Sequence, residues 1–406
     1  MKKSILVIIL YFLFQGLFHN LGHPVTPAFV RSLDIEDYMF GVFFASMSFG
    51  LMIGAPIWGT LGDRGRRKLY IFIGLTLYSI GQIGFAYSNH EVLMIIFRFI
   101  SGFGVVGSMT ILTSILIEKS ELKDRAKHLA YSAAAVTLGA SLGYYVGGFL
   151  STNVFLRDLI GTDDYRLIFL IQALLNILYA AVIVLTIKLN KDELTQTNRP
   201  SFFHSLKEIT QIKPSLLLFL ISLTLITIGA TNLSKYIDIY FDELGYSPQD
   251  LGTFVMTTGI VSLVASIFIV PIFARFRKQL KVIAIIQVLS AFIVFFVFRA
   301  EKFLLTIYTI YMIYVVFKAI YQPLEQNYIS KHASEGKYGR IMGLRQSFVS
   351  IGMIIGPLLG GFLYEIKPLL LFDFSGFAFI VGVLLLGLVY VLEMKDVRRD
   401  EHVSIH

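Results

Sequence analysis

The chain has 406 residues, of which 56% are apolar and 15% are charged, whereas soluble proteins have roughly 45–50% apolar and 25% charged residues. Apolar stretches of about 20 residues, the length needed to cross a bilayer, recur along the whole chain rather than at one end. This excludes a soluble protein and predicts that most of the chain lies in lipid. The chain has no cysteine, which excludes disulfides and thiolate metal sites.

The apolar stretches predict helices. An unpaired backbone group is costly in hydrocarbon, so only helices and closed barrels cross a membrane, and these stretches lack the alternation of barrel strands. We predict an all-α membrane protein with twelve transmembrane helices. The predicted spans are residues 5–29, 38–61, 69–87, 91–117, 127–151, 166–188, 214–240, 250–274, 280–299, 303–330, 340–364 and 368–392.

Lysine and arginine are distributed unequally between the two sides of these spans. If the N-terminus is cytoplasmic, most of the 35 Lys and Arg residues lie in cytoplasmic segments, while Asp and Glu divide evenly. The positive-inside rule then predicts a multi-pass protein of the cell membrane with both termini cytoplasmic. The net charge of +8 is attributed to the anionic inner leaflet rather than to nucleic acid. The residue usage, with one Trp and many Phe, Ile and Lys, suggests a bacterial source.

The first span carries four polar side chains, Gln15, His19, Asn20 and His23. The two histidines are four residues apart and therefore share one helix face. A zinc site needs at least three protein ligands, and no third ligand is near in sequence, so we expect no metal. We favour a titrating or hydrogen-bonding pair that faces a cavity, with simple packing as the alternative.

The loop after the second span reads Gly59-Thr-Leu-Gly-Asp63-Arg64-Gly65-Arg66-Arg67-Lys68. It resembles the signature of the major facilitator superfamily (MFS), Gly-x-Leu-x-Asp-Arg-x-Gly-Arg-Arg, with one residue missing between Arg64 and Gly65. In the fourth span, Arg98-Phe-Ile-Ser-Gly102-Phe-Gly104 resembles the Arg-x-x-x-Gly-x-Gly element of the same family. The resemblance implies the MFS fold of two pseudo-symmetric six-helix bundles. It also implies secondary transport by alternating access, without a cofactor.

The same resemblance implies a conformational latch formed by Gly59, Asp63, Arg64, Gly65, Arg66 and Arg67. A carboxylate such as Asp63 at a helix end can bind the N-terminus of a neighbouring helix through its dipole. The family implies that this neighbour is the eleventh span, and Arg345 near its start is a further candidate. The alternative is a solvated basic loop that only satisfies the positive-inside rule.

Two glycine-rich stretches match each other in the fifth and eleventh spans. The first contains Gly139, Gly143, Gly147 and Gly148, and the second contains Gly352, Gly356, Pro357, Gly360 and Gly361. Small residues every four positions let helices approach closely, so these are predicted packing positions. The pattern resembles the Gly-x-x-x-Gly-Pro-x-x-Gly-Gly element associated with drug:proton antiporters. Tyr144 replaces the proline in the first copy, whereas the second copy has it.

The repeat also divides the chain. Asn20-Leu21 and Asn232-Leu233 match at almost the same sequence offset as the glycine stretches, which indicates parallel repeats. We predict an N-terminal bundle over 1–188, a cytoplasmic linker over 189–213, a C-terminal bundle over 214–392 and a cytoplasmic tail over 393–406. The linker is predicted to contain a short interfacial helix, because apolar residues recur there at helical spacing, at Phe202, Phe203, Leu206, Ile209 and Ile212.

Few charged residues lie inside the spans. Charge at bilayer depth costs roughly 2.5–3.5 kcal/mol, so each needs a partner or a wet cavity. Lys318 and Glu325 are seven residues apart on one helix face, about 10 Å along the axis, so they can share a cavity without touching. Lys235 and Asp238 are three apart and can either pair or reach interfacial water. Arg98 has no counterpart in the other half.

A proton-driven transporter needs a group that binds and releases protons inside the membrane. Glu325 is the favoured carrier, because a low dielectric opposes ionisation of a carboxyl group. Asp238, Asp373 and a histidine of the first span are the alternatives. A purely structural role for Glu325, as the partner of a nearby cation, is equally open.

We predict a monomeric secondary transporter that exports amphiphilic or drug-like molecules in exchange for protons. A second hypothesis keeps the fold and assigns an organic anion, sugar or lipid-like cargo, bound by Arg98, Lys318 and Lys235. The abundant Phe and Tyr suit an adaptable apolar site, although lipid-facing surface accounts for most of them. A membrane enzyme or receptor is disfavoured, because we find no paired histidine–carboxylate or cysteine motif. A phosphate-binding Gly-Lys-Ser/Thr loop is also missing.

Overall fold

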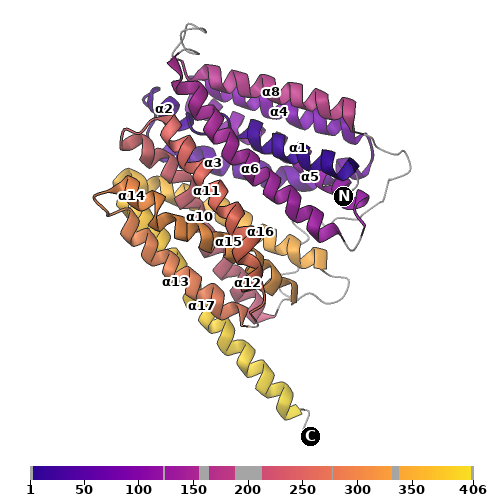
Figure 1. Cartoon of the computed structure of the whole chain (residues 1–406), viewed down its shortest axis with the longest axis vertical. Helices are drawn as coiled ribbons and strands as arrows, with labels where there is room; N and C mark the ends of the chain where they lie inside the picture. Colours follow the sequence, from indigo (N-terminus) through magenta and orange to yellow (C-terminus); the bar gives the residue numbers. More distant parts are fainter. Residues whose placement is uncertain are drawn as a thin grey trace. The chain divides into compact units, whose positions relative to one another are not determined.

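The computed structural model describes residues 3–121, 124–154, 164–187, 213–276, 278–331 and 338–403, and all regular elements among them are helices (Figure 1). This confirms the predicted all-α fold. The first helices are α1 (Lys3–His19), α2 (Thr26–Arg31), α3 (Tyr38–Asp63), α4 (Arg67–Tyr87), α5 (Glu91–Lys119), α6 (Arg125–Thr152) and α8 (Arg166–Thr186). They are followed by α10 (Pro214–Glu243), α11 (Pro248–Val264), the π-helical turn η2 (Ala265–Ile269), α12 (Val270–Ala274), α13 (Gln279–Val297), α14 (Phe303–Tyr308), α15 (Ile310–Lys331), α16 (Tyr338–Ile366) and α17 (Pro368–Val403).

Within the described residues, 11 helices are long and apolar enough to cross a membrane, and α1 is a shorter apolar helix. The predicted span 5–29 is broken, because α1 ends at His19 and α2 begins only at Thr26. The break contains Gly22 and Pro24, which both disfavour a continuing helix. The Thr26 hydroxyl donates to the Gly22 carbonyl at 2.7 Å across the turn.

The chain forms two compact units. Unit 1 comprises Met1–Arg199 and Ile237–Leu263, and unit 2 comprises Pro200–Tyr236 and Val264–His406. Helix α10 contributes to both units. The division into sequence halves at 189–213 therefore stays a prediction, and the predicted interfacial helix lies outside the described residues. The predicted tail begins within α17, which continues to Val403.

In unit 1, α3 and α4 pack on α5, α1 packs on α6, and α4 lies beside α8 (Figure 1). Side chains such as Ile8, Leu75, Leu112 and Ile183 form a common core of α1, α4, α5 and α8. The contact of α1 with α6 is close because a Cβ at Gly139 or Gly143 would meet the carbonyl oxygen of Leu13 or Leu17 in α1, respectively. A Cβ at Gly147 would meet the carbonyl oxygen of Leu21, in the turn that follows α1. These glycines therefore lie where the packing prediction placed them. Gly148 instead approaches the carbonyl of Pro248.

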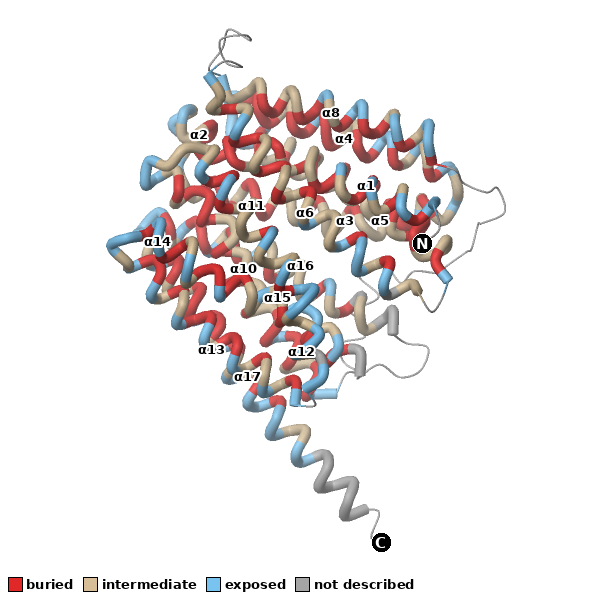
Figure 2. The backbone as a smooth tube through the Cα atoms, viewed as in Figure 1, coloured by how far each residue is buried: buried red, intermediate tan, exposed pale blue. Residues whose placement is uncertain are grey.

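In unit 2, α13 packs on α15 and α17 around a core that includes Leu220, Ile283, Leu324 and Val389. Figure 2 shows buried residues alternating with more exposed ones along α13 and α17. The second glycine stretch faces α10, since Cβ atoms at Gly352, Gly356 and Gly360 would meet Thr227, Ile228 and Asn232, respectively. The carbonyl of Pro357 accepts a hydrogen bond from the Tyr236 hydroxyl at 2.8 Å, and Gly361 is buried.

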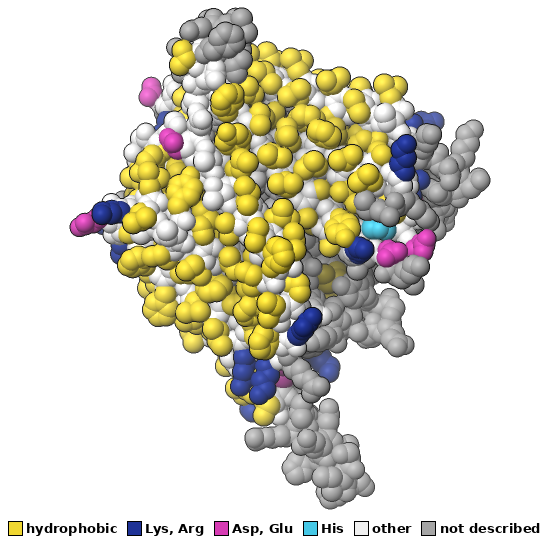
Figure 3. Space-filling model, viewed as in Figure 1, with side chains coloured by type: hydrophobic (Ala, Val, Ile, Leu, Met, Phe, Trp, Pro, Cys, Tyr) yellow, Lys and Arg dark blue, Asp and Glu magenta, His cyan; other side chains and the backbone are white. Residues whose placement is uncertain are grey.

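The outer surfaces of the helices are apolar. Leu185 is 81% exposed, Ile366 73% and Phe268 67%. In Figure 3, hydrophobic side chains cover most of the visible surface of each unit, and the charged side chains lie at its margins. Contiguous apolar surface of this extent is unsuited to water and fits contact with lipid.

Candidate functional site

His19 is buried at the end of α1 in a hydrogen-bonded cluster. Its Nε2 lies 3.2 Å from Asn176 Oδ1, and its ring centroid lies 4.5 Å from that of Tyr78. The carbonyl of His19 accepts hydrogen bonds from Gln172 Nε2 at 2.8 Å and from the Tyr78 hydroxyl at 2.9 Å. These contacts tie the end of α1 to α4 and α8. His19 can therefore hold the end of α1 in place, which is an alternative to a role in proton binding.

His23 has different surroundings from His19, although the two were predicted to share a face. Its ring is parallel to that of Tyr144 at a centroid distance of 5.4 Å. The Tyr144 hydroxyl donates to Asp238 Oδ2 at 2.9 Å, and Asp238 is 3% exposed. Two predicted cavity residues thus meet through Tyr144, the residue that replaces the proline of the family element. Asn20, directly after α1, donates to the carbonyl of Gly16 in that helix at 2.7 Å.

The described residues contain no group of three His, Asp or Glu side chains placed to hold a metal ion.

Arg98 is buried in unit 1, with its guanidinium carbon 3.6 Å from the centroid of Phe85. This distance is typical of a cation–π contact. Its Nε has no hydrogen-bond partner among the described residues.

The latch loop makes a tight turn between α3 and α4. Gly65 has φ of 95° and Arg66 has φ of 54°, so both are left-handed, which is costly for Arg66. Arg67 is buried, donates from Nε to the Gly62 carbonyl at 3.0 Å and forms a two-pronged ion pair with Glu118 at the end of α5. Arg67 is therefore part of the helix packing rather than of a solvated loop.

The remaining predicted latch residues are distributed as follows: Gly59 is buried in α3, Asp63 ends α3, Arg64 is exposed, and Arg345 lies in unit 2.

A separate ion-pair network surrounds Arg31, which the sequence gives no local reason to single out. Arg31 Nη2 lies 2.7 Å from Asp37 Oδ2, and Nη1 lies 3.0 Å from Asp242 Oδ2 on α10. This network ties the end of α2 to the end of α10 within unit 1.

A cavity of about 240 Å³ lies wholly within unit 2, between α10, α13, α15 and α16. Helix periodicity explains its lining. Tyr314, Lys318, Tyr321, Gln322 and Glu325 recur at intervals of three or four on one face of α15. Thr227, Thr231, Ser234 and Lys235 do the same on α10. Lys318 and Glu325 both line this cavity, as their spacing predicts.

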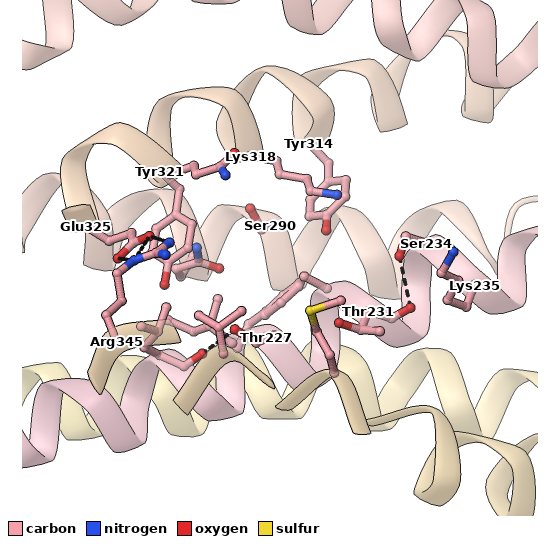
Figure 4. Close-up of a pocket in the computed structure, with 18 residues that line it drawn as sticks. Thr227, Thr231, Ser234, Lys235, Ser290, Tyr314, Lys318, Tyr321, Glu325 and Arg345 are labelled. Carbon is pink, nitrogen blue, oxygen red and sulfur yellow. Dashed lines mark hydrogen bonds and ion pairs between the residues drawn. The ribbon is translucent and has the colours of Figure 1, made fainter. Parts of the chain in front are cut away.

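Glu325 and Arg345 form an ion pair at one end of this cavity (Figure 4). Arg345 Nε lies 2.9 Å from Oε1 and 3.0 Å from Oε2 of Glu325, and Nη2 also donates to Oε1. The side chains are 1% exposed for Glu325 and 11% for Arg345. The carboxylate is thus satisfied by a cation from a neighbouring helix. Sequence reasoning assigned Arg345 only to the latch.

The other end of the cavity carries positive charge. Figure 4 shows Lys318 and Tyr314 on α15 and Lys235 on α10, and all three line the cavity. Gln287, Ser290 and Tyr314 also line it, and sequence reasoning missed all three. Uncharged polar residues are common in membrane helices, so their types gave no signal. Only their spacing relative to Lys318 could have identified Tyr314.

The sequence matches the model of the Major Facilitator Superfamily over residues 5–317 and 217–404. The chain belongs to this superfamily. The predicted membership of the MFS is thereby confirmed. As an MFS member, the chain is a multi-pass membrane protein that transports small-molecule substrates.

Its relatives in the MFS include the quinolone resistance protein NorA of Staphylococcus aureus, 26% identical over 98% of each chain. Multidrug resistance protein 2 of Bacillus subtilis is 25% identical over 97% of this chain and 96% of its own. Among solved structures, a bacterial homologue of the human lysosomal transporter Spinster gives a TM-score of 0.74 at 14% identity, covering 98% of both chains. The D-xylose–proton symporter gives 0.70 at 16% identity over 94% and 96%. These structures support the MFS fold.

Proposed function

We propose that this MFS member exports small amphiphilic molecules in exchange for protons, by alternating access. Two relatives of full length are named for resistance to quinolones and to multiple drugs, which supports efflux. The observation that carries the proposal is the placement of Glu325. It is a buried carboxylate inside a spanning helix, at a cavity, and it is paired with the cation Arg345.

The Glu325–Arg345 pair supplies a mechanism for proton coupling. Burial opposes the charged form of the carboxyl group, while Arg345 favours it. When a proton binds Glu325, the ion pair loses its negative member, and Arg345 must find other partners. Because Arg345 is on α16 and Glu325 on α15, proton binding changes the contact between two helices of unit 2. Such a change can bias the equilibrium between two conformations.

The remaining assignments follow from the sequence. We infer that both termini are cytoplasmic in a bacterial plasma membrane, that the transporter works as a monomer, and that it has no enzymatic activity. The excess of Lys and Arg on the side of the termini supports this orientation. We also keep the latch at Asp63 as a proposal, supported by its position at the end of α3. An organic anion, sugar or lipid-like cargo is the second candidate, favoured by the cations of the unit 2 cavity.

The test is a proton measurement on purified protein. Addition of a transported amphiphile should release or take up protons, and Glu325→Gln should abolish this change. His19→Ala is the comparison, because His19 is the other predicted proton carrier. If Glu325→Gln leaves the proton change intact and His19→Ala removes it, the coupling site is on α1 and the assignment of Glu325 is wrong.

A further inference from the structure

Three polar groups of the unit 2 cavity have no partner within the described residues. The Lys318 ammonium is accessible from the cavity and makes no hydrogen bond or ion pair there. The Tyr314 hydroxyl is buried without a hydrogen-bond partner, and Tyr314 as a whole is 4% exposed. Gln287 is also 4% exposed, and its amide makes no hydrogen bond in the described part of the chain. A buried hydroxyl without a hydrogen-bond partner, such as that of Tyr314, is rare in folded proteins.

The carboxylate in the cavity cannot neutralise Lys318. Glu325 is already bound by Arg345, and it lies seven residues, about 10 Å along the axis of α15, from Lys318. Lys235 on α10 lines the same cavity and adds a second positive charge. The cavity lining thus has three cationic side chains and one acidic side chain. Charge inside the membrane is costly without a counter-charge, so an anion from outside the protein would stabilise Lys318 in this cavity.

The dimensions and walls of the cavity restrict that anion. Drug-sized sites have volumes of roughly 300–1,000 Å³, and this cavity, at about 240 Å³, is smaller. Leu223, Ile226, Met353 and Phe379 contribute apolar walls. The cavity therefore suits one acid group with a short apolar segment, while the rest of a larger molecule extends beyond it. Metal cations are disfavoured by the excess positive charge.

We propose that the unit 2 cavity binds the carboxylate or sulfonate end of an amphiphilic organic anion, with Lys318 as its counter-charge. Tyr314 and Gln287 donate hydrogen bonds to the acid oxygens. The inference that the exported amphiphile is an acid rests on the proposed export function. The inference that the cavity binds an acid rests on the cavity alone.

The test compares two probes that differ only in the group at issue. Pyrenebutyric acid and pyrenebutanol share the ring system and the chain, and their affinities for the purified full-length protein in detergent can be measured by equilibrium dialysis. We expect the acid to bind at least about tenfold more tightly than the alcohol. Lys318→Met should remove this preference, and Lys318→Arg should retain most of it. Tyr314→Phe should weaken binding of the acid a few-fold and leave the alcohol unchanged.

Lys281→Met is the matched control, because Lys281 is an exposed lysine of α13 that does not line the cavity. It should bind both probes like the unmodified protein. Equal affinities for acid and alcohol in the unmodified protein would overturn the proposal, as would an acid preference that survives Lys318→Met. Lys318→Arg guards against a folding defect, since a folded variant that keeps the charge must keep the preference.

The outcome is independent of the test of export. If the acid preference depends on Lys318 but no transport occurs in reconstituted vesicles, the binding site stands and the export function fails. If proton-coupled export occurs without an acid preference, the function stands and this inference fails.

Discussion

The Glu325–Arg345 pair offers a quantitative test of the proposed coupling site. The pair has three contacts between nitrogen and oxygen atoms, and its side chains are 1% and 11% exposed. Removal of one partner of a buried ion pair leaves an uncompensated charge, which costs about 3–5 kcal/mol. Replacement of both partners by neutral residues of similar size is often close to neutral. Glu325→Gln and Arg345→Met should therefore each lower the free energy of unfolding by about 3 kcal/mol.

The double variant should restore stability to within about 1 kcal/mol of the unmodified protein, which gives a coupling energy of about 5 kcal/mol. The assay is denaturant unfolding of the purified protein in detergent. Arg299 and Asp373 supply a matched control in the same unit, because their ion pair is 46% and 23% exposed. Exposed pairs are worth about 1 kcal/mol or less. If the effects of Glu325→Gln and Arg345→Met simply add, within about 0.5 kcal/mol, the two side chains do not act as a pair and the reasoning is refuted.

Three further predictions follow from other contacts. Gly147→Ala should destabilise the protein by about 1–3 kcal/mol, because the added Cβ would meet the Leu21 carbonyl. Gly387→Ala is the control and should have little effect, since no neighbouring atom lies within 4 Å of its Cβ. Thermal unfolding of the two variants compares them directly. Tyr144→Phe should cost about 1–3 kcal/mol through loss of the donor to Asp238, and an unchanged stability would show that this hydrogen bond is absent in the membrane. If one proton enters for each monoanion exported, each turnover moves two charges, so 100 mV should contribute about 4.6 kcal/mol to the driving force. Export rates under potassium diffusion potentials measure this, and rates independent of potential would contradict the exchange of a proton for an anion.

The fold was largely predictable because a chain in lipid must satisfy its backbone hydrogen bonds internally. Apolar stretches of spanning length must be helices, and most predicted ranges lie within a few residues of the observed ones. The first and last spans are the exceptions, since α17 continues to Val403, beyond the predicted end at 392. Continuous hydropathy over residues 5–29 hid the break between His19 and Thr26, where Gly22 and Pro24 outweigh the apolar pattern.

The candidate site was predictable only where helix periodicity suffices. The spacing of seven placed Lys318 and Glu325 on one face of α15, and both line the cavity. The pairing of Glu325 with Arg345 joins two helices, and no local spacing encodes which side chains of separate helices meet. The same limit hid the contact of Arg31 with Asp242, which are 211 positions apart.

The most direct test of the central claim is gradient-driven transport in vesicles that contain only this protein. A fluorescent amphiphile should accumulate when a proton gradient of the appropriate direction is imposed and should stop accumulating when a protonophore collapses the gradient. Glu325→Gln should abolish gradient-driven accumulation while retaining exchange of labelled for unlabelled substrate, because exchange requires alternating access without net proton movement. Accumulation that survives the protonophore, or that proceeds at the unmodified rate in Glu325→Gln, would contradict proton-coupled export through this carboxylate.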